Sequence, residues 1–257
     1  MICRLLFLVL FLLPPAAAAA GPAGKVLLSI GTTAAFDSQG RSRTLAKGAP
    51  VYSGDTVATM DGRLQLRFSD GAMMSLSPNT RFRIDSYAYS GKSDGNEKGW
   101  FSLLRGGIRT ITGAIGKARH QAYRVSTVVA TIGIRGTAYR AQLCAGDCGA
   151  KGDNGDKGDK GDKGDKQRED GLYVDTSAGT VVLSNKAGSL DVPAGKSAFV
   201  RDIDTLPKLQ SATDTGSAMP VPQPEPTYRA GEQESLPAEP THPEPMPAAP
   251  GQSPYVY

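Results

Sequence analysis

The sequence predicts an all-β protein, a single irregular solenoid-like or sandwich-like stack of short strands with a Gly-X-Y insertion and a disordered proline-rich tail. Three observations support this class. Apolar and polar residues alternate over short runs, as in strands with one buried face. Glycine, Asp-Gly or Asn turn signals end these runs at spacings of about ten residues. Residues 25–89 contain no apolar stripe with helical spacing.

Residues 1–20 are predicted to be a signal peptide. Arg4 precedes an apolar run from Leu5 to Leu13, which is followed by two prolines and a stretch of alanines. This order is typical of a secretory signal cleaved after Ala20, and the run is short for a membrane span. An uncleaved anchor is the alternative. We expect a periplasmic or secreted protein with no membrane span after signal removal.

Residues 21–205 are predicted to be one β-domain. Its first half contains alternating runs at residues 25–30, 64–68, 72–76 and 82–84, with turn signals at Asp61-Gly62 and Asp70-Gly71. Its last part returns to strand-like runs at residues 173–174, 181–183, 190–192 and 197–200. Trp100, the only tryptophan, is expected to pack in the core or at an edge and not to serve as a ligand platform.

The longest β-branched run of the mature chain covers residues 123–143. Val, Ile, Thr and Tyr favour a half-buried pleated surface, so the run predicts two short strands with a tight corner at residues 134–137, Ile-Arg-Gly-Thr. An arginine inside such a run is costly to bury without partners. Arg135 is therefore expected to point outward or to bond local carbonyls, and contact with a ligand is the alternative.

Three collinear passages resemble FecR-type domains. They are VVATIGIRGTAYRAQ, with Arg135, Gly136 and Thr137 as the family motif; KGAPVYSGDTVATMDGRLQLRFSDGAMMSLSPNTRFRI; and GLYVDTSAGTVVLSNKAGSLDVPAGKSAFV. The resemblance covers about residues 25–201 with one insertion. It implies a periplasmic β-domain of a kind found in iron-signalling regulators and favours the solenoid-like stack. Those regulators also have a cytoplasmic segment and a membrane helix, which a chain beginning with a signal peptide is not expected to share.

Residues 101–146 contain no Asp or Glu. They carry seven basic side chains, which form the candidate binding face: Arg105, Arg109, Lys117, Arg119, Arg124, Arg135 and Arg140. If these side chains converge, they attract phosphate, carboxylate or sulfate groups. The alternative is a solvated face balanced by acids from elsewhere in the fold. Nucleic acid is not expected, because an exported protein seldom meets it and no aromatic recognition motif is present.

Cys144 and Cys148 are the only cysteines after signal removal, and in an exported chain they predict a small disulfide loop. A collagen-like Lys-Gly-Asp insertion, residues 145–170, follows, with glycine at every third position. It lacks proline, so we expect a hydrophilic loop and no independently stable triple helix.

The tail, residues 206–257, holds twelve of the 18 prolines and has a net charge of −4, against +7 for residues 21–205.

These features favour a non-catalytic module that binds or senses, with an envelope protein or an anionic envelope polymer as its partner. No enzyme is expected: the mature β-domain has one histidine, His120, and no nucleophile or HExxH motif. No cofactor and no metal site are expected. One alternative is an assembly protein that oligomerises through the Gly-X-Y tract. Another is a polysaccharide-cleaving enzyme that uses paired carboxylates.

Overall fold

A computed structural model describes residues 21–92, 95–148 and 168–210. The predicted signal peptide, residues 149–167 of the Gly-X-Y insertion and the tail beyond Gln210 lie outside the described residues. The predicted domain boundaries therefore stay predictions. Contacts divide the chain into the units Met1–Ser217 and Ala218–Tyr257, and every described residue belongs to the first.

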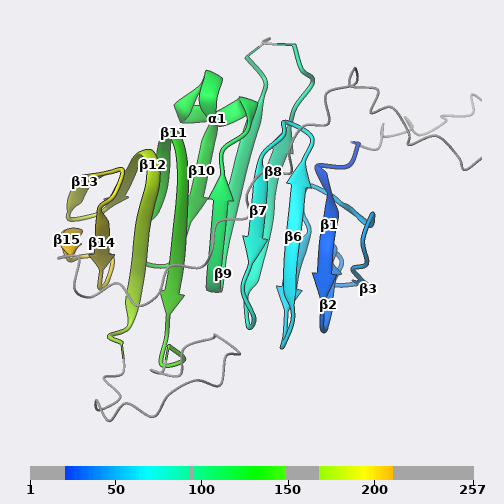
Figure 1. Cartoon of the computed structure of the whole chain (residues 1–257), viewed down its shortest axis with the longest axis horizontal. Coiled ribbons are helices and arrows are strands. Elements are labelled where there is room, and N and C mark those ends of the chain that lie inside the picture. Colours follow the sequence, from blue (N-terminus) through cyan, green and yellow to red (C-terminus); the bar gives the residue numbers. More distant parts are fainter. Residues whose placement is uncertain (1–20, 93–94, 149–167, 211–257) are drawn as a thin grey trace, which may run out of the picture. The chain divides into compact units, whose positions relative to one another are not determined.

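The described residues form fifteen strands, one short α-helix and one 3-10 helix (Figure 1). The elements are β1 (Gly24–Ile30), β2 (Thr33–Phe36), β3 (Ser42–Thr44), β4 (Pro50–Val51), β5 (Thr56–Thr59), β6 (Arg63–Phe68), β7 (Met73–Leu76), β8 (Arg81–Ala88), β9 (Lys98–Ile111), α1 (Ala114–Ala118), η1 (His120–Ala122), β10 (Tyr123–Ser126), β11 (Thr131–Cys144), β12 (Gly171–Asn185), β13 (Gly188–Pro193), β14 (Ser197–Val200) and β15 (Lys208–Gln210). The predicted all-β class is confirmed.

Three long strands, β9, β11 and β12, divide the sheet into two layers because each changes partners part-way along its length. The first layer has the order β4-β1-β6-β7-β9-β11-β12-β14-β15 and uses residues 106–111, 138–144 and 171–178 of the long strands. The second layer has the order β3-β2-β5-β8-β9-β10-β11-β12-β13 and uses residues 98–105, 131–135 and 180–185. The chain passes between the layers repeatedly, so the fold has features of both a solenoid and a sandwich.

Each long strand bends at a glycine with positive φ: Gly106 in β9 (81°), Gly136 in β11 (62°) and Gly179 in β12 (68°). Gly136 and Gly179 are adjacent across the β11–β12 pair. A Cβ on Gly179 would lie 2.3 Å from the carbonyl oxygen of Gly136. Glycine is thus needed for conformation and for close approach of the backbones. The predicted corner at residues 134–137 is such a bend inside one long strand, because β11 continues through it.

One hydrophobic core fills the space between the layers. The first layer contributes Leu66 and Met74, and the second contributes Phe82 and Ile132, all at most 1% exposed. Aromatic rings also cross the interface: the Phe68 and Phe101 centroids are 5.2 Å apart. The period-2 alternation noted in the sequence therefore separates this core from two outer faces.

Helix α1, which the sequence analysis did not anticipate, follows the end of β9. The carboxylate of Asp70 in the β6–β7 turn accepts hydrogen bonds from the backbone N–H of Ile115 at 3.2 Å and from the Tyr87 hydroxyl at 3.1 Å. The Ala114 N–H donates to the Asp70 carbonyl at 2.9 Å. Asp70 thereby ties the helix to a hairpin of the first layer and to β8 of the second.

Candidate functional site

The seven basic residues predicted to form one binding face lie in several parts of the fold. Arg109 and Arg140 are on the outer side of the first layer, and Arg124 is on the outer side of the second. Arg105 and Arg135 lie beside strand bends, and the remaining two, Lys117 and Arg119, lie at and just after α1. The fold brings Arg109 and Arg140 together as register partners on β9 and β11.

The order of strands adds further basic side chains near this pair. Lys25, Arg63 and Arg67 are exposed on β1 and β6, where their buried neighbours along the strand point into the core. Strand β7 connects β6 to β9, and Ser75 on β7 is the register partner of Arg109. We call the outer side of the first layer from β1 to β11 the basic face; its charged residues are Lys25, Arg63, Arg67, Arg109 and Arg140.

Two pairs of like charges stand opposite each other on the basic face. Lys25 is the register partner of Arg67, and Arg109 is the register partner of Arg140. Like charges directly opposite in a sheet are destabilising by a fraction of 1 kcal/mol, up to about 1. Asp175 on β12, the partner of Arg140 on its other side, places an acid at the border of the face. This arrangement concentrates positive potential over the neighbouring strands.

The Arg-Gly-Thr motif at residues 135–137 builds the bend of β11. Arg135 points outward and pairs with Asp191 on β13 at 3.3 Å, which agrees with the outward orientation expected from the sequence. Gly136 supplies the positive φ. Thr137 is buried, and its carbonyl accepts a hydrogen bond from the Thr112 hydroxyl at 2.6 Å. The contacts of the motif are therefore structural.

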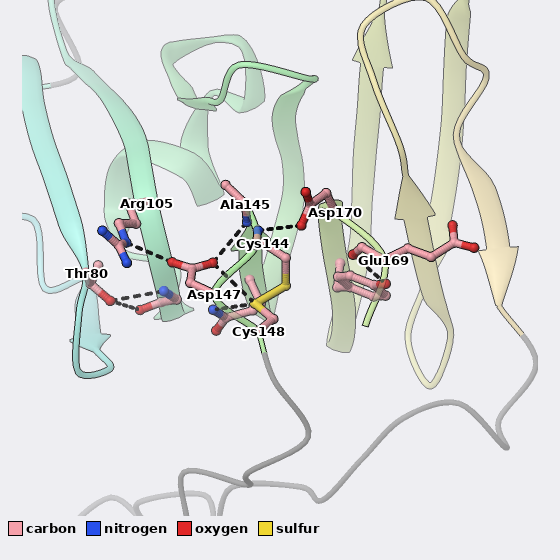
Figure 2. Close-up of a disulfide and its surroundings, with 12 residues drawn as sticks. Thr80, Arg105, Cys144, Ala145, Asp147, Cys148, Glu169 and Asp170 are labelled. Atoms are coloured by element: carbon pink, nitrogen blue, oxygen red, sulfur yellow. Dashed lines mark hydrogen bonds and ion pairs between the residues drawn. A yellow bond between two sulfur atoms is a disulfide. The ribbon is translucent and has the colours of Figure 1, made fainter. Parts of the chain in front are cut away.

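Arg105 belongs to a corner organised by the predicted disulfide between Cys144 and Cys148 (Figure 2). The cysteine Cα atoms are 5.4 Å apart. Within the ring, Asp147 accepts hydrogen bonds from Arg105 Nε at 2.8 Å and from the Ala145 N–H at 2.9 Å. Burial raises the pKa of the Asp147 carboxyl, but these two donors outweigh it and hold that pKa below its usual value.

The returning end of the insertion is fixed beside the same corner. Figure 2 shows Asp170 next to Ala145 and the disulfide; its carboxylate accepts a hydrogen bond from the Gly146 N–H at 2.5 Å. Glu169 pairs with Arg201 at 3.0 Å. Cys144 and Gly171 are register partners at the ends of β11 and β12. The two ends of the Gly-X-Y insertion therefore lie close together, where β11 ends and β12 begins as paired strands.

Trp100 lies on the outer side of the second layer and is half-buried, outside the core cluster. The Arg124 guanidinium carbon is 3.9 Å from the centroid of the indole ring, and the Lys98 ammonium is 5.3 Å from it. Arg119 donates to the carbonyl of Glu97 at 2.9 Å. The fold thus places Arg124, one of the seven predicted residues, over the tryptophan.

Within residues 21–92, 95–148 and 168–210, no group of three or more His, Cys, Asp or Glu side chains is arranged to hold a metal ion. The same part of the chain has no helix with the length and apolar character needed to cross a membrane.

The sequence analysis missed the contributions of β1 and β6 to the basic face. A signal was present, because Arg63 and Arg67 alternate with buried leucines and must share one side of their strand. The strand order was not visible, because β7, the hairpin partner of β6, pairs on its other edge with residues of β9 that are distant in sequence.

Comparison with known proteins supports the resemblance noted in the sequence. Two crystal structures of a provisionally assigned anti-sigma factor from Parabacteroides distasonis ATCC 8503 are similar, each with 13% identity and a TM-score of 0.41, covering 60% of this chain. The chain spans 57% of the length of that protein. No curated protein matches the sequence. Residues 55–151, which lie within the range of that resemblance, match the family model described as FecR protein.

Proposed function

We propose that this protein is an exported, non-catalytic module of the bacterial cell envelope that binds an anionic envelope polymer through its basic face. The observation that carries the proposal is the row of basic side chains on the outer side of β1, β6, β9 and β11, which includes two like-charge register pairs. The FecR domain supports a binding or sensing role and not a catalytic one.

The physical argument rests on charge and shape. An outer sheet face is extended, and the backbone of neighbouring strands repeats at about 4.8 Å. Basic groups on such a face suit a polymer with repeating anionic groups better than one small anion in a closed pocket. Register partners of like charge bring two basic groups close together, so that one anionic group can contact both. Salt should weaken the complex, because exposed charges are screened within about 10 Å at 0.1 M ionic strength.

The test is capture of anionic polymer from a cell-envelope extract by residues 21–257, at about 0.05 M and about 1 M salt. The test variant is Arg67→Glu with Arg109→Glu. The matched control is Lys47→Glu with Lys196→Glu, which makes the same change in net charge at two exposed positions off the basic face.

We expect salt-sensitive capture that the test variant reduces several-fold and the control leaves near the level of the unmodified chain. Equal losses in both variants would mean that only net charge matters, and the basic face would lose its assignment. Capture of a protein that survives high salt and both variants would also contradict the proposal.

A further inference from the structure

The outer side of the second layer carries a compact group of donors that the basic face does not include. We call Lys98, Trp100 and Arg124 the Trp100 cluster. Arg124 on β10 and Trp100 on β9 are register partners in a parallel pair, which places the guanidinium over the indole ring at 3.9 Å. Lys98, two residues before Trp100, extends over the same ring. Such cation–π contacts restrict a long side chain to one orientation.

The donors of this cluster lack acidic partners within the described ranges. Other arginines do find them: Arg105 pairs with Asp147, and Arg135 pairs with Asp191. No Asp or Glu of the described residues lies within ion-pair distance of Lys98 or Arg124. The indole Nε1 of Trp100 is buried and has no hydrogen-bond acceptor in that part of the chain. The exposed guanidinium of Arg124 and the ammonium of Lys98 therefore have no carboxylate partner among the described residues.

The stacking of Arg124 determines which ligand group fits. A guanidinium lying flat on an aromatic ring keeps its N–H groups at the edge of the plane, and these bind a carboxylate in a bidentate manner. Charge complementarity therefore favours an anionic group approaching beside the ring.

The surface next to Arg124 is aliphatic and open over Gly133 and Val182, and the next strand carries Asp191, which pairs with Arg135. Ile132 is the register partner of Val125, so the next residue, Gly133, lies beside Arg124. Gly133 pairs with Val182, which is half-buried on the same outer side. A Cβ on Gly133 would meet only Val182 atoms, at 3.7 and 3.8 Å. A small apolar side chain can rest there while a neighbouring carboxylate reaches Arg124.

We propose that the Trp100 cluster is a docking site for an acidic peptide segment of a partner protein, with a carboxylate on Arg124 and an aliphatic side chain over Gly133 and Val182. Trp and Arg are the side chains most enriched among binding hot spots. An aliphatic strip beside a preorganised arginine suits a peptide better than a polysaccharide. This site and the basic face lie on different layers and rest on separate observations.

The experiment uses the intrinsic fluorescence of Trp100, the only tryptophan in the chain. Residues 21–257 are titrated with a capped hexapeptide of alternating Glu and Val. A Gln-Val hexapeptide and polygalacturonate, which carries carboxylates on sugar rings, are titrated as comparisons. Variants Arg124→Gln and Arg124→Lys are compared with Lys196→Gln, a loss of one exposed charge outside both the Trp100 cluster and the basic face. Far-ultraviolet circular dichroism confirms that each variant is folded.

We expect the Glu-Val peptide to change the Trp100 emission saturably. Arg124→Gln should weaken binding about ten-fold or more, since charge-assisted bidentate bonds are lost. Arg124→Lys should weaken it less, and Lys196→Gln should have no effect. The Gln-Val peptide should not bind. Absence of saturable peptide binding or equal affinity in Arg124→Gln would overturn the proposal. So would a change of Trp100 emission by polygalacturonate that is as tight as that by the peptide and is lost in Arg124→Gln.

Discussion

Gly179→Ala should destabilise the domain more than Gly136→Ala, although both glycines bend neighbouring strands at similar φ, 68° and 62°. An alanine in this left-handed region costs about 1–2 kcal/mol at either position. At Gly136 the added Cβ meets nothing within 4 Å, so conformational strain is the whole effect. At Gly179 it would lie 2.3 Å from the Gly136 oxygen and 2.7 Å from the Arg135 oxygen. Both are backbone atoms, so the strands must separate, at a further cost of about 1–3 kcal/mol.

The measurement is urea unfolding of the two variants, followed by Trp100 fluorescence and circular dichroism. We expect a loss in free energy of unfolding of about 1–2 kcal/mol for Gly136→Ala and about 2–5 kcal/mol for Gly179→Ala. At about 2–4 °C per kcal/mol for a domain of this size, Tm falls by about 2–8 °C and about 4–20 °C respectively.

The difference between the two variants is the decisive quantity. Alanine reduces the entropy of the unfolded chain by the same amount at each position, so this contribution cancels in the comparison. Losses equal within about 0.5 kcal/mol, or a larger loss for Gly136→Ala, would refute the argument that close backbone approach at the β11–β12 bend requires glycine.

Two other predictions concern buried polar groups. Asp55→Ala should cost about 3–5 kcal/mol in urea unfolding, because Asp55 is 2% exposed and its loss leaves Arg43 without its carboxylate. Glu169→Ala, which removes an exposed ion pair with Arg201, should cost under about 1 kcal/mol. Similar losses in the two variants would contradict this reasoning. Burial raises the pKa of Tyr139 to about 12, and it also raises that of its hydrogen-bonded neighbour Tyr123. Since the unfolded pKa is about 10, stability should be complete below pH 10 and fall as pH rises to about 12. Tyrosinate absorbance at alkaline pH, measured beside unfolding, checks this, and ionisation of all nine tyrosines near pH 10 in the folded protein would contradict it.

Local pattern was enough to predict the β class and many of the strands. Leu64, Leu66 and Phe68 alternate with polar residues. This alternation indicates which side of the strand is buried, and it does so independently of the strands with which β6 pairs. The disulfide was predictable for a similar reason, since Cys144 and Cys148 are near each other in the chain and have no competing cysteines after signal removal.

Other properties depended on pairing between distant segments. The sequence indicated a basic stretch in residues 101–146. Only the strand order showed that Arg109 lies opposite Arg140, on the same outer side as Arg67, while Arg124 faces outward from the other layer. The sequence likewise placed a glycine after Arg135, but not the approach of Gly179 to its carbonyl oxygen. Alternation is a property of one strand and is visible in its residues. Register, strand order and the change of partners at a bend are properties of two or more strands, and they exist only once the chain has folded.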